Sequence, residues 1–218
     1  MIHDNLSPVT FRTIPCAVDA LYEEKKSRFL AHLAPLHHEK DALITLQTLR
    51  ESHPDARHHS YAYRLQTGIE RASDDGEPGG TAGRPMLHVL QQQALTDCII
   101  VVTRYFGGIL LGAGGLVRAY TEATSLAVQA ATIVTYVEHD RYRISIPYAS
   151  YDLALHRLNH AAWHVQATFG EVVTLIIEAP SADRMQLAPI LNSLCHDDQA
   201  SVPEMSGIMS PRSDASTS

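Results

Sequence analysis

Three acidic residues and one arginine stand close together in the stretch SDDGEPGGTAGRPM, which covers residues 73–86. The carboxylates of Asp74, Asp75 and Glu77 could bind magnesium or act as acid–base groups. The guanidinium of Arg84 could bind a phosphate. Adjacent aspartates in a glycine-rich loop are also common turn residues that take no part in chemistry. The residue types alone leave both interpretations open.

Arg84 is followed by Pro85, which suits the first position of a helix because the missing proline N–H costs least there. Such a helix places Arg84 at the positive end of the helix dipole, which is unfavourable by about 0.3–1 kcal/mol unless an anion accompanies it. An acid of the same loop or a bound phosphate or carboxylate could supply that anion, and the two can coexist. We therefore expect the loop 73–83 to be held in one shape.

A second glycine-rich segment, GGILLGAGGLVRAY, covers residues 107–120 and follows the apolar run CIIVVTRYF. It satisfies neither common nucleotide-binding motif. Ala113 and Gly114 stand where a P-loop needs lysine and then serine or threonine, and Val117 stands where a Rossmann fingerprint needs glycine. A strand, a glycine loop and a helix N-terminus can still bind an anion. Alternatively, the glycines serve only a tight turn and close packing.

The sequence lacks the other common catalytic and metal motifs. Its thirteen histidines do not have the paired spacing of a zinc helix, and no cysteine stands near them at ligand spacing. No GxSxG motif is present, and Cys98 opens an apolar run typical of a buried strand. We therefore expect no catalytic residue, no metal and no cofactor.

Composition narrows the class of protein. Apolar residues make up 45% and charged residues 19%, which is typical of a globular protein. No apolar run approaches the roughly 20 residues of a membrane span, and the N-terminus does not read as a secretory signal. The three distant cysteines, Cys16, Cys98 and Cys195, fit reduced thiols in the cytoplasm. A net charge of −7 argues against general polyanion binding and favours a confined site.

Hydrophobic patterns predict the elements that position these motifs. Residues 18–36 suit either a strand pair or one long interrupted strand, and residues 98–106 suit a central strand buried on both faces. Helices are expected before Pro54, from Pro85 and after Gly115, and a further strand is expected near residues 58–66. Such strand and helix ends can bring their polar side chains together at one edge of a sheet.

After Thr135 the pattern restarts in the order β-α-β-β-α-β, with the last strand near residues 200–205. This is the order of a ferredoxin-like unit. The small polar residues of the C-terminus are typical of disorder. We therefore predict one domain at residues 1–135, a ferredoxin-like domain at residues 138–206 and a disordered tail at residues 207–218.

The motifs SDDGEPGGTAGRPML and VVTRYFGGILLGAGGLVRAY, with ARHHSYAYRL before them, resemble those of the IMPACT family (UPF0029), in particular its bacterial YigZ type. The resemblance implies an α+β fold with an N-terminal domain like ribosomal protein S5 domain 2. It also implies that the ferredoxin-like domain is similar to the last domain of elongation factor G. Eukaryotic members are linked to translational control through a kinase-activating partner. For bacterial members, binding to nucleic acid or to the translation machinery is proposed by fold analogy.

We therefore expect a non-enzymatic cytoplasmic protein that contacts RNA, the ribosome, a translation factor or a kinase-regulating protein, and no membrane. The alternative is an enzyme that acts on a phosphate-bearing small molecule through the loop acids and a clamp of arginines. The expected anion or RNA groove is built from Asp74, Asp75, Glu77, Thr81, Arg84, Arg104, Tyr105, Gly114 and Arg118.

Overall fold

The computed structural model describes residues 10–194 and 204–211. Contacts between residues divide the chain into two compact units, an N-terminal unit of residues 11–135 and a C-terminal unit that contains the described residues from Tyr136 onward. Each unit combines helices with a β-sheet, which confirms the α+β class. The domain limits given above and the independent folding of the two units stay predictions.

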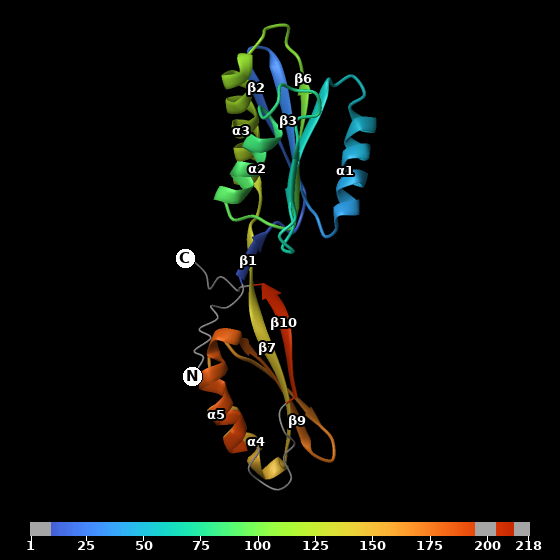
Figure 1. Cartoon of the computed structure of the whole chain (residues 1–218). Coiled ribbons are helices and arrows are strands. Elements are labelled where there is room, and N and C mark those ends of the chain that lie inside the picture. The colour runs from blue at the N-terminus through green and yellow to red at the C-terminus, as the bar shows by residue number, and fades with distance from the viewer. Residues whose placement is uncertain (1–9, 195–203, 212–218) are drawn as a thin grey trace. The chain divides into compact units, whose positions relative to one another are not determined.

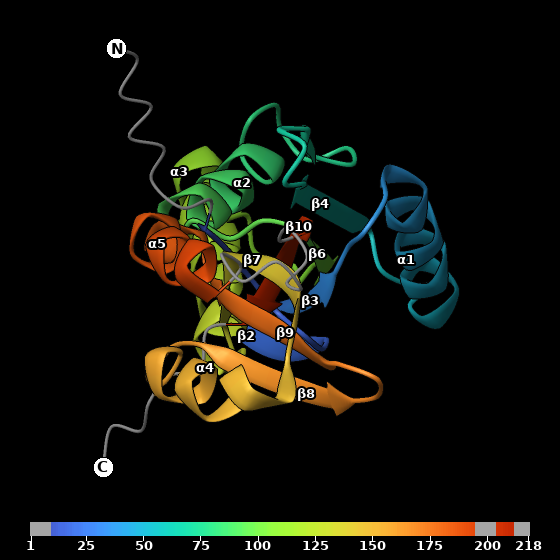
Figure 2. The same cartoon turned by 90° about the horizontal axis from the view of Figure 1, so that it is seen from below.

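The N-terminal unit has three layers. Its antiparallel sheet has the order β2-β3-β6-β4-β5, with α2 and α3 on one face and α1 on the other (Figures 1 and 2). The division between the two units falls within β1 (Thr10–Thr13), which is not a strand of this sheet. The elements of the N-terminal unit are β2 (Val18–Glu24), β3 (Ser27–Pro35), α1 (Glu39–Ser52), β4 (His58–Arg64), β5 (Glu70–Ser73), α2 (Gly83–Gln92), β6 (Cys98–Tyr105) and α3 (Gly112–Ala130).

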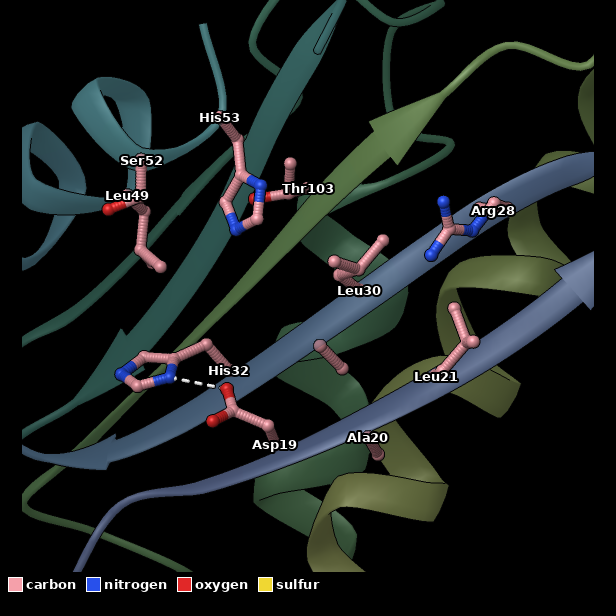
Figure 3. Close-up of a pocket in the computed structure, with 11 residues that line it drawn as sticks. Asp19, Ala20, Leu21, Arg28, Leu30, His32, Leu49, Ser52, His53 and Thr103 are labelled. Atoms are coloured by element: carbon pink, nitrogen blue, oxygen red, sulfur yellow. Dashed lines mark hydrogen bonds and ion pairs between the residues drawn. The ribbon is translucent and has the colours of Figure 1, made fainter. Parts of the chain in front are cut away.

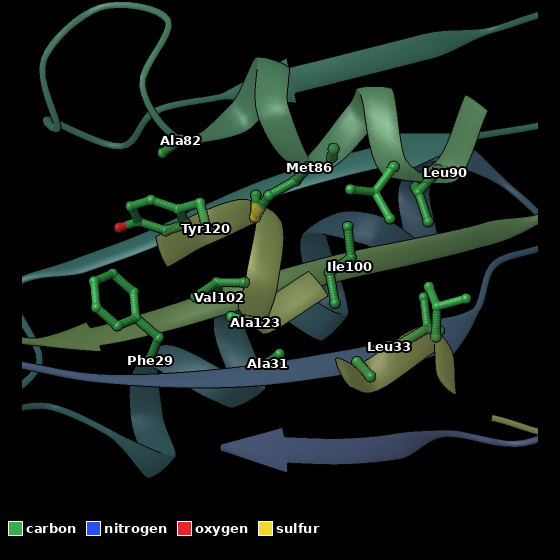
Figure 4. Close-up of a cluster of buried hydrophobic side chains, with 14 of the residues drawn as sticks. Phe29, Ala31, Leu33, Ala82, Met86, Leu90, Ile100, Val102, Tyr120 and Ala123 are labelled. Carbon is green, nitrogen blue, oxygen red and sulfur yellow. The ribbon is translucent and has the colours of Figure 1, made fainter. Parts of the chain in front are cut away.

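The central strand β6 is buried on both faces, as its unbroken run of apolar β-branched residues predicts. On one face Ile100 and Val102 pack with Met86 and Tyr120 of the two helices (Figure 4). On the other face Ile99 and Val101 belong to a smaller cluster that includes residues of α1. The strand therefore holds its last residues, including Arg104, in a fixed position at one end of the sheet.

Strands β2 and β3 form a hairpin, which decides between the two alternatives for residues 18–36. Lys25 and Lys26 at its tip both have positive φ angles, of 48° and 66°, as a type I′ turn requires. The backbone of this tip lies so close to Gly107 that any Cβ on Gly107 would overlap it. The Gly107 N–H also donates a hydrogen bond to Ser27 Oγ at 3.1 Å. Gly107 is thus required by close approach of two backbones.

The C-terminal unit places helices on one face of a second antiparallel sheet. Four of its strands have the order β10-β7-β9-β8. The core of the unit contains Ile144 and Ile177 of the sheet and Leu187 and Leu191 of the last helix. The main elements are β7 (Val134–Ile146), α4 (Tyr151–Arg157), β8 (His164–Phe169), β9 (Val173–Pro180), α5 (Arg184–Leu194) and β10 (Glu204–Pro211), with short 3-10 turns at Tyr148–Ser150 and Ser181–Asp183.

The last strand is longer than the sequence predicts. Pairing of β10 with β7 runs from Glu204 opposite Arg143 to Pro211 opposite Tyr136, so residues 207–211 are in a strand and not in a disordered tail. The C-terminal segment as a whole is rich in small polar residues, which are typical of disorder, but pairing with β7 satisfies backbone N–H and C=O groups of residues 207–211. The rest of the predicted tail, residues 212–218, lies outside the described residues.

A buried carboxylate joins sheet and helix in the C-terminal unit. Asp140 of β7 accepts hydrogen bonds from Arg184 Nε and Nη2 at 2.8 and 2.9 Å, from Ser181 Oγ at 3.0 Å and from Tyr142 Oη at 3.1 Å. Burial by itself raises the pKa of Asp140, but the bonds from Arg184, Ser181 and Tyr142 outweigh it and hold the pKa below the ordinary value.

We predict that Gly107→Ala destabilises the N-terminal unit by at least about 2 kcal/mol, because the new Cβ forces two backbones apart. Gly114→Ala is the matched control, since Gly114 is helical and has open space around its Cβ position. Gly114→Ala should leave the free energy of unfolding unchanged or raise it by about 0.5–1 kcal/mol. Urea denaturation of both variants checks this, and equal effects would contradict it.

We also predict acid sensitivity of the C-terminal unit. The pKa of Asp140 is lower in the folded state than in the unfolded chain, so its contribution to stability is complete above the unfolded pKa of about 3.9. That contribution is lost as the pH falls through the folded pKa. In Asp140→Asn it is missing at every pH, so the urea midpoint should fall less between pH 5 and pH 2.5 than in the parent. An unchanged pH dependence in this variant would contradict the prediction.

Candidate functional site

The carboxylate of Asp74 organises the loop between β5 and α2. It accepts hydrogen bonds from the N–H groups of Gly80 at 2.8 Å, Ala82 at 3.0 Å and Gly83 at 2.9 Å. Burial alone raises the pKa of Asp74, but these three bonds and the charge of Arg84 bring it below the ordinary value. Asp74 is therefore an ionised acceptor at the start of α2, and it takes up N–H groups that the helix leaves unpaired.

The position of Arg84 follows from this arrangement. The helix begins at Gly83, two residues before the predicted start at Pro85, because Asp74 accepts the Ala82 and Gly83 N–H groups. Gly83 packs directly on β5, where an added Cβ would lie 2.6 Å from the Ser73 nitrogen. Arg84 is exposed in the first turn and acts on the pKa of Asp74. The loop acid thus supplies the anion that this cation needs.

Asp75 connects the same loop to two other elements. Its carboxylate accepts hydrogen bonds from the His59 N–H at 2.7 Å and from Arg50 of α1 at 2.9 Å. Its carbonyl oxygen lies 2.8 Å from His58 Nδ1. A carbonyl only accepts, so Nδ1 carries the hydrogen and Nε2 is directed toward Glu77, at 4.0 Å. The loop is therefore tied to β4 and α1 through a single aspartate.

Glu77 is the acid of a buried three-residue cluster. Its Oε1 accepts hydrogen bonds from Arg104 Nη1 at 2.6 Å and from Tyr120 Oη at 2.8 Å. The side chains of Arg104 and Glu77 are only 7% and 3% exposed. The Arg104 guanidinium also lies 5.4 Å from the Phe29 ring centre and 5.7 Å from that of Phe106. Loop, sheet and α3 meet at this ion pair.

A groove of about 430 Å³ lies above the pair, between the two glycine-rich loops. One wall comes from the first loop, and the other comes from the segment that leads into α3. Glu77 and Arg104 are in its lining, together with exposed Arg57 and half-buried His58. The lining consists of Arg57, His58, Gly76, Glu77, Pro78, Arg104, Phe106, Leu110, Leu111, Gly112, Ala113 and Leu116.

We expected Arg84, Arg104 and Arg118 to line one groove. Only Arg104 does so, because neither Arg84 nor Arg118 is among the lining residues. Leu116 of α3 does line it, and Arg118 stands two residues later, about 200° further around the helix. Arg118 is exposed there and influences the pKa of Tyr22 on β2. Helix phase thus separates Arg118 from the groove.

The remaining predicted residues surround the groove without lining it. Asp74 and Asp75 accept the hydrogen bonds, described above, that hold the first loop in place. Thr81 is buried and donates a hydrogen bond to the Pro78 carbonyl at 2.6 Å. Tyr105 Oη lies 3.0 Å from His53 Nδ1, and Gly114 is exposed in the first turn of α3. These residues support or flank the site.

Arg57 and His58 are groove residues that the sequence reasoning missed. Arg57 directly precedes β4 and His58 is its first residue, and β4 pairs with β6 so that His58 lies opposite Arg104. The signal was available in the segment ARHHSYAYRL, where these two side chains stand at the beginning of a predicted strand. Antiparallel pairing of that strand start with the end of the central strand would have placed these side chains beside Arg104.

A second hollow, of about 510 Å³, lies where α1 leaves part of the sheet uncovered (Figure 3). Its polar side chains are already paired, since His32 Nδ1 lies 2.7 Å from Asp19 Oδ1 and Arg28 lies 3.5 Å from Glu23. Leu21 and Leu30 lie opposite each other between these two pairs. This regular ladder of charged and apolar pairs is typical of an exposed sheet face, so the groove is the stronger candidate.

The groove and the fold define a two-unit α+β protein with a basic, glycine-lined site on its N-terminal unit. Residues 25–128 match the Impact N-terminal domain, so this part of the chain belongs to the IMPACT family. It is 50% identical over 103 residues to the IMPACT family member YvyE of Bacillus subtilis, an alignment that covers 46% of this chain and 48% of that protein.

A second relative is the IMPACT family member YigZ of Escherichia coli, which is 44% identical over 127 residues, or 55% of this chain and 61% of that protein. The chain thus spans about half to three-fifths of these relatives' lengths. A crystal structure of a hypothetical protein matches with a TM-score of 0.59 and 30% identity, over 90% of this chain and 96% of the other. That match supports the architecture of the chain and carries no functional information.

The described part of the chain has neither a membrane-spanning helix nor a cluster of metal-binding side chains. No helix between residues 10 and 194 is long and apolar enough to cross a membrane. Within residues 10–194, no cluster of three His, Cys, Asp or Glu side chains is suited to hold a metal ion. Asp74, Asp75 and Glu77 instead accept hydrogen bonds from three different sets of partners.

We predict that Asp74→Ala loosens the loop without unfolding the unit. Removing the acceptor of three N–H groups costs about 0.5–2 kcal/mol, as for a lost helix cap, so the amides of Gly80, Ala82 and Gly83 should exchange about 2- to 30-fold faster. Asp55→Ala, at an exposed acid outside the loop, is the control. Hydrogen exchange by NMR measures both variants, and unchanged protection in Asp74→Ala would refute this role.

Proposed function

We propose that this protein is a non-enzymatic cytoplasmic binding protein that contacts RNA or another component of the translation apparatus through the groove. The observation that carries the proposal is the composition of the groove. Arg57 and Arg104 lie on the lining with His58, while Glu77 is the single acid and is already bound by Arg104 and Tyr120. The groove is therefore suited to an anionic ligand.

The relation to translation comes from membership of the IMPACT family, whose eukaryotic members are linked to translational control. The proposed domain types are S5-domain-2-like for the N-terminal unit and ferredoxin-like for the C-terminal unit. Support for the second comes from its order β7-α4-β8-β9-α5-β10 and from its sheet order β10-β7-β9-β8. A role in translational regulation through a protein partner is part of the same proposal.

An enzyme that acts on a phosphate-bearing small molecule receives less support. Such an enzyme needs carboxylates that are free to bind a metal or to exchange a proton. Asp74 is occupied by three N–H groups, Asp75 by His59 and Arg50, and Glu77 by Arg104 and Tyr120, as described above. The three acids therefore have sufficient structural roles in the loop without any ligand.

We predict that Arg57→Ala weakens binding of a short single-stranded RNA, whereas Arg118→Ala does not. Both arginines are exposed and both variants lose one positive charge, but only Arg57 lines the groove. Fluorescence anisotropy at several salt concentrations is the measurement. If Arg57 contacts one phosphate, the slope of log affinity against log salt should decrease by about 0.7 in its variant only. Equal slopes in the parent and both variants would contradict the proposal.

A further inference from the structure

The walls of the groove are more aliphatic than an RNA site requires. Leu110, Leu111 and Leu116 line it, and Phe106 is the only aromatic residue among the lining residues. Leu110 is 83% exposed and Phe106 40% exposed, next to Ile109 at 44%. Proteins that bind single-stranded nucleic acid usually offer several flat rings on which successive bases stack. This surface instead suits an aliphatic side chain.

The lining of the groove contains one unpaired arginine, Arg57, beside the paired Arg104 and Glu77. Arg57 forms no ion pair with any described residue. Arg104 is held between two aromatic rings, and its buried Nε has no hydrogen-bond partner among the described residues. An unpartnered buried donor on a charged group is costly, so a group that accepts a hydrogen bond is favoured here.

The start of α3 adds further donors on the opposite wall. The helix has 19 residues, no side chain caps its N-terminus, and its first turn contains no acid. Gly112 and Ala113, its first two residues, line the groove. Their N–H groups have no partner inside the helix, and the positive end of the dipole lies at the same place.

From this we propose that the groove binds a carboxylate that stands next to an aliphatic side chain in a partner protein. The inference rests on the proposed function of the groove and names its ligand class. The carboxylate lies between Arg57 and the start of α3, and the aliphatic side chain packs on Phe106, Leu110 and Leu116. A volume of about 430 Å³ suits a few such groups and is too small for a helix.

The occupant that this arrangement favours is the free C-terminus of a chain whose last residue is aliphatic. Capture of a terminal carboxylate by backbone N–H groups is a known mode of peptide recognition. An internal Glu or Asp beside Leu or Ile is the alternative that the test must exclude.

The test is titration of the ¹⁵N-labelled full chain, observed by NMR, with four probes. N-acetyl-leucine mimics an aliphatic C-terminus, and acetyl-Glu-Leu-amide mimics an internal acid. N-acetyl-leucinamide lacks the charge, and a short oligouridylate represents RNA. We expect N-acetyl-leucine to shift the amides of Arg57, Gly112 and Ala113, with binding at least tenfold tighter than that of N-acetyl-leucinamide. Binding of acetyl-Glu-Leu-amide as tight as that of N-acetyl-leucine would contradict a C-terminal ligand.

Two substitutions localise the binding. Ala113→Glu places a negative charge on the groove wall at an exposed first-turn position, where an acid suits the helix dipole. It should weaken carboxylate binding at least tenfold. Gln129→Glu makes the same charge change near the other end of the same helix and should have no such effect. If Ala113→Glu does not fold, Arg57→Ala with Arg118→Ala as its control replaces the pair.

The outcomes distinguish this inference from the proposed function. If the oligouridylate shifts the groove amides and neither carboxylate probe does, the inference is wrong and the proposed function stands. If N-acetyl-leucinamide binds as tightly as the carboxylates, the charge has no role and the inference is wrong. If no probe affects the groove, neither the inference nor RNA binding at this site survives.

Discussion

The buried ion pair between Glu77 and Arg104 is the interaction on which the site depends. It joins a glycine-rich loop to the central strand, and Tyr120 extends it to α3. Removing one partner of a buried pair leaves an uncompensated charge, which typically costs about 3–5 kcal/mol. The pair therefore both requires and maintains the close approach of three elements that are distant in the chain. The groove exists because these elements meet there.

This arrangement explains why two segments so poor in secondary-structure formers are nevertheless held in place. Side-chain acceptors replace regular structure in the first loop, where Asp74 and Asp75 bind N–H groups and a guanidinium. Close backbone contact holds the second loop, where Gly107 lies against the tip of the β2–β3 hairpin. The glycines therefore permit contacts in this protein and do not indicate flexibility.

Local features of the chain were predictable from the sequence, and long-range partners were not. The apolar run of β6 and the need of Arg84 for an acid both follow from neighbouring residues. The pairing of Glu77 with Arg104 spans 27 positions and depends on how the loop folds back, which no local pattern encodes. The position of Arg118 was available from helix periodicity, because the buried Leu116 and Tyr120 already define the opposite face. The extra length of β10 required knowledge of its partner strand.

The pairing of β10 with β7 also bears on the order of folding. Partner residues in this pair are separated by 61 positions, for Arg143 and Glu204, to 75 positions, for Tyr136 and Pro211. Strands so distant in the chain lose loop-closure entropy before their contacts form, whereas the β2–β3 hairpin closes at a two-residue turn. We therefore expect the β2–β3 hairpin to form early in folding and β10 to join β7 late.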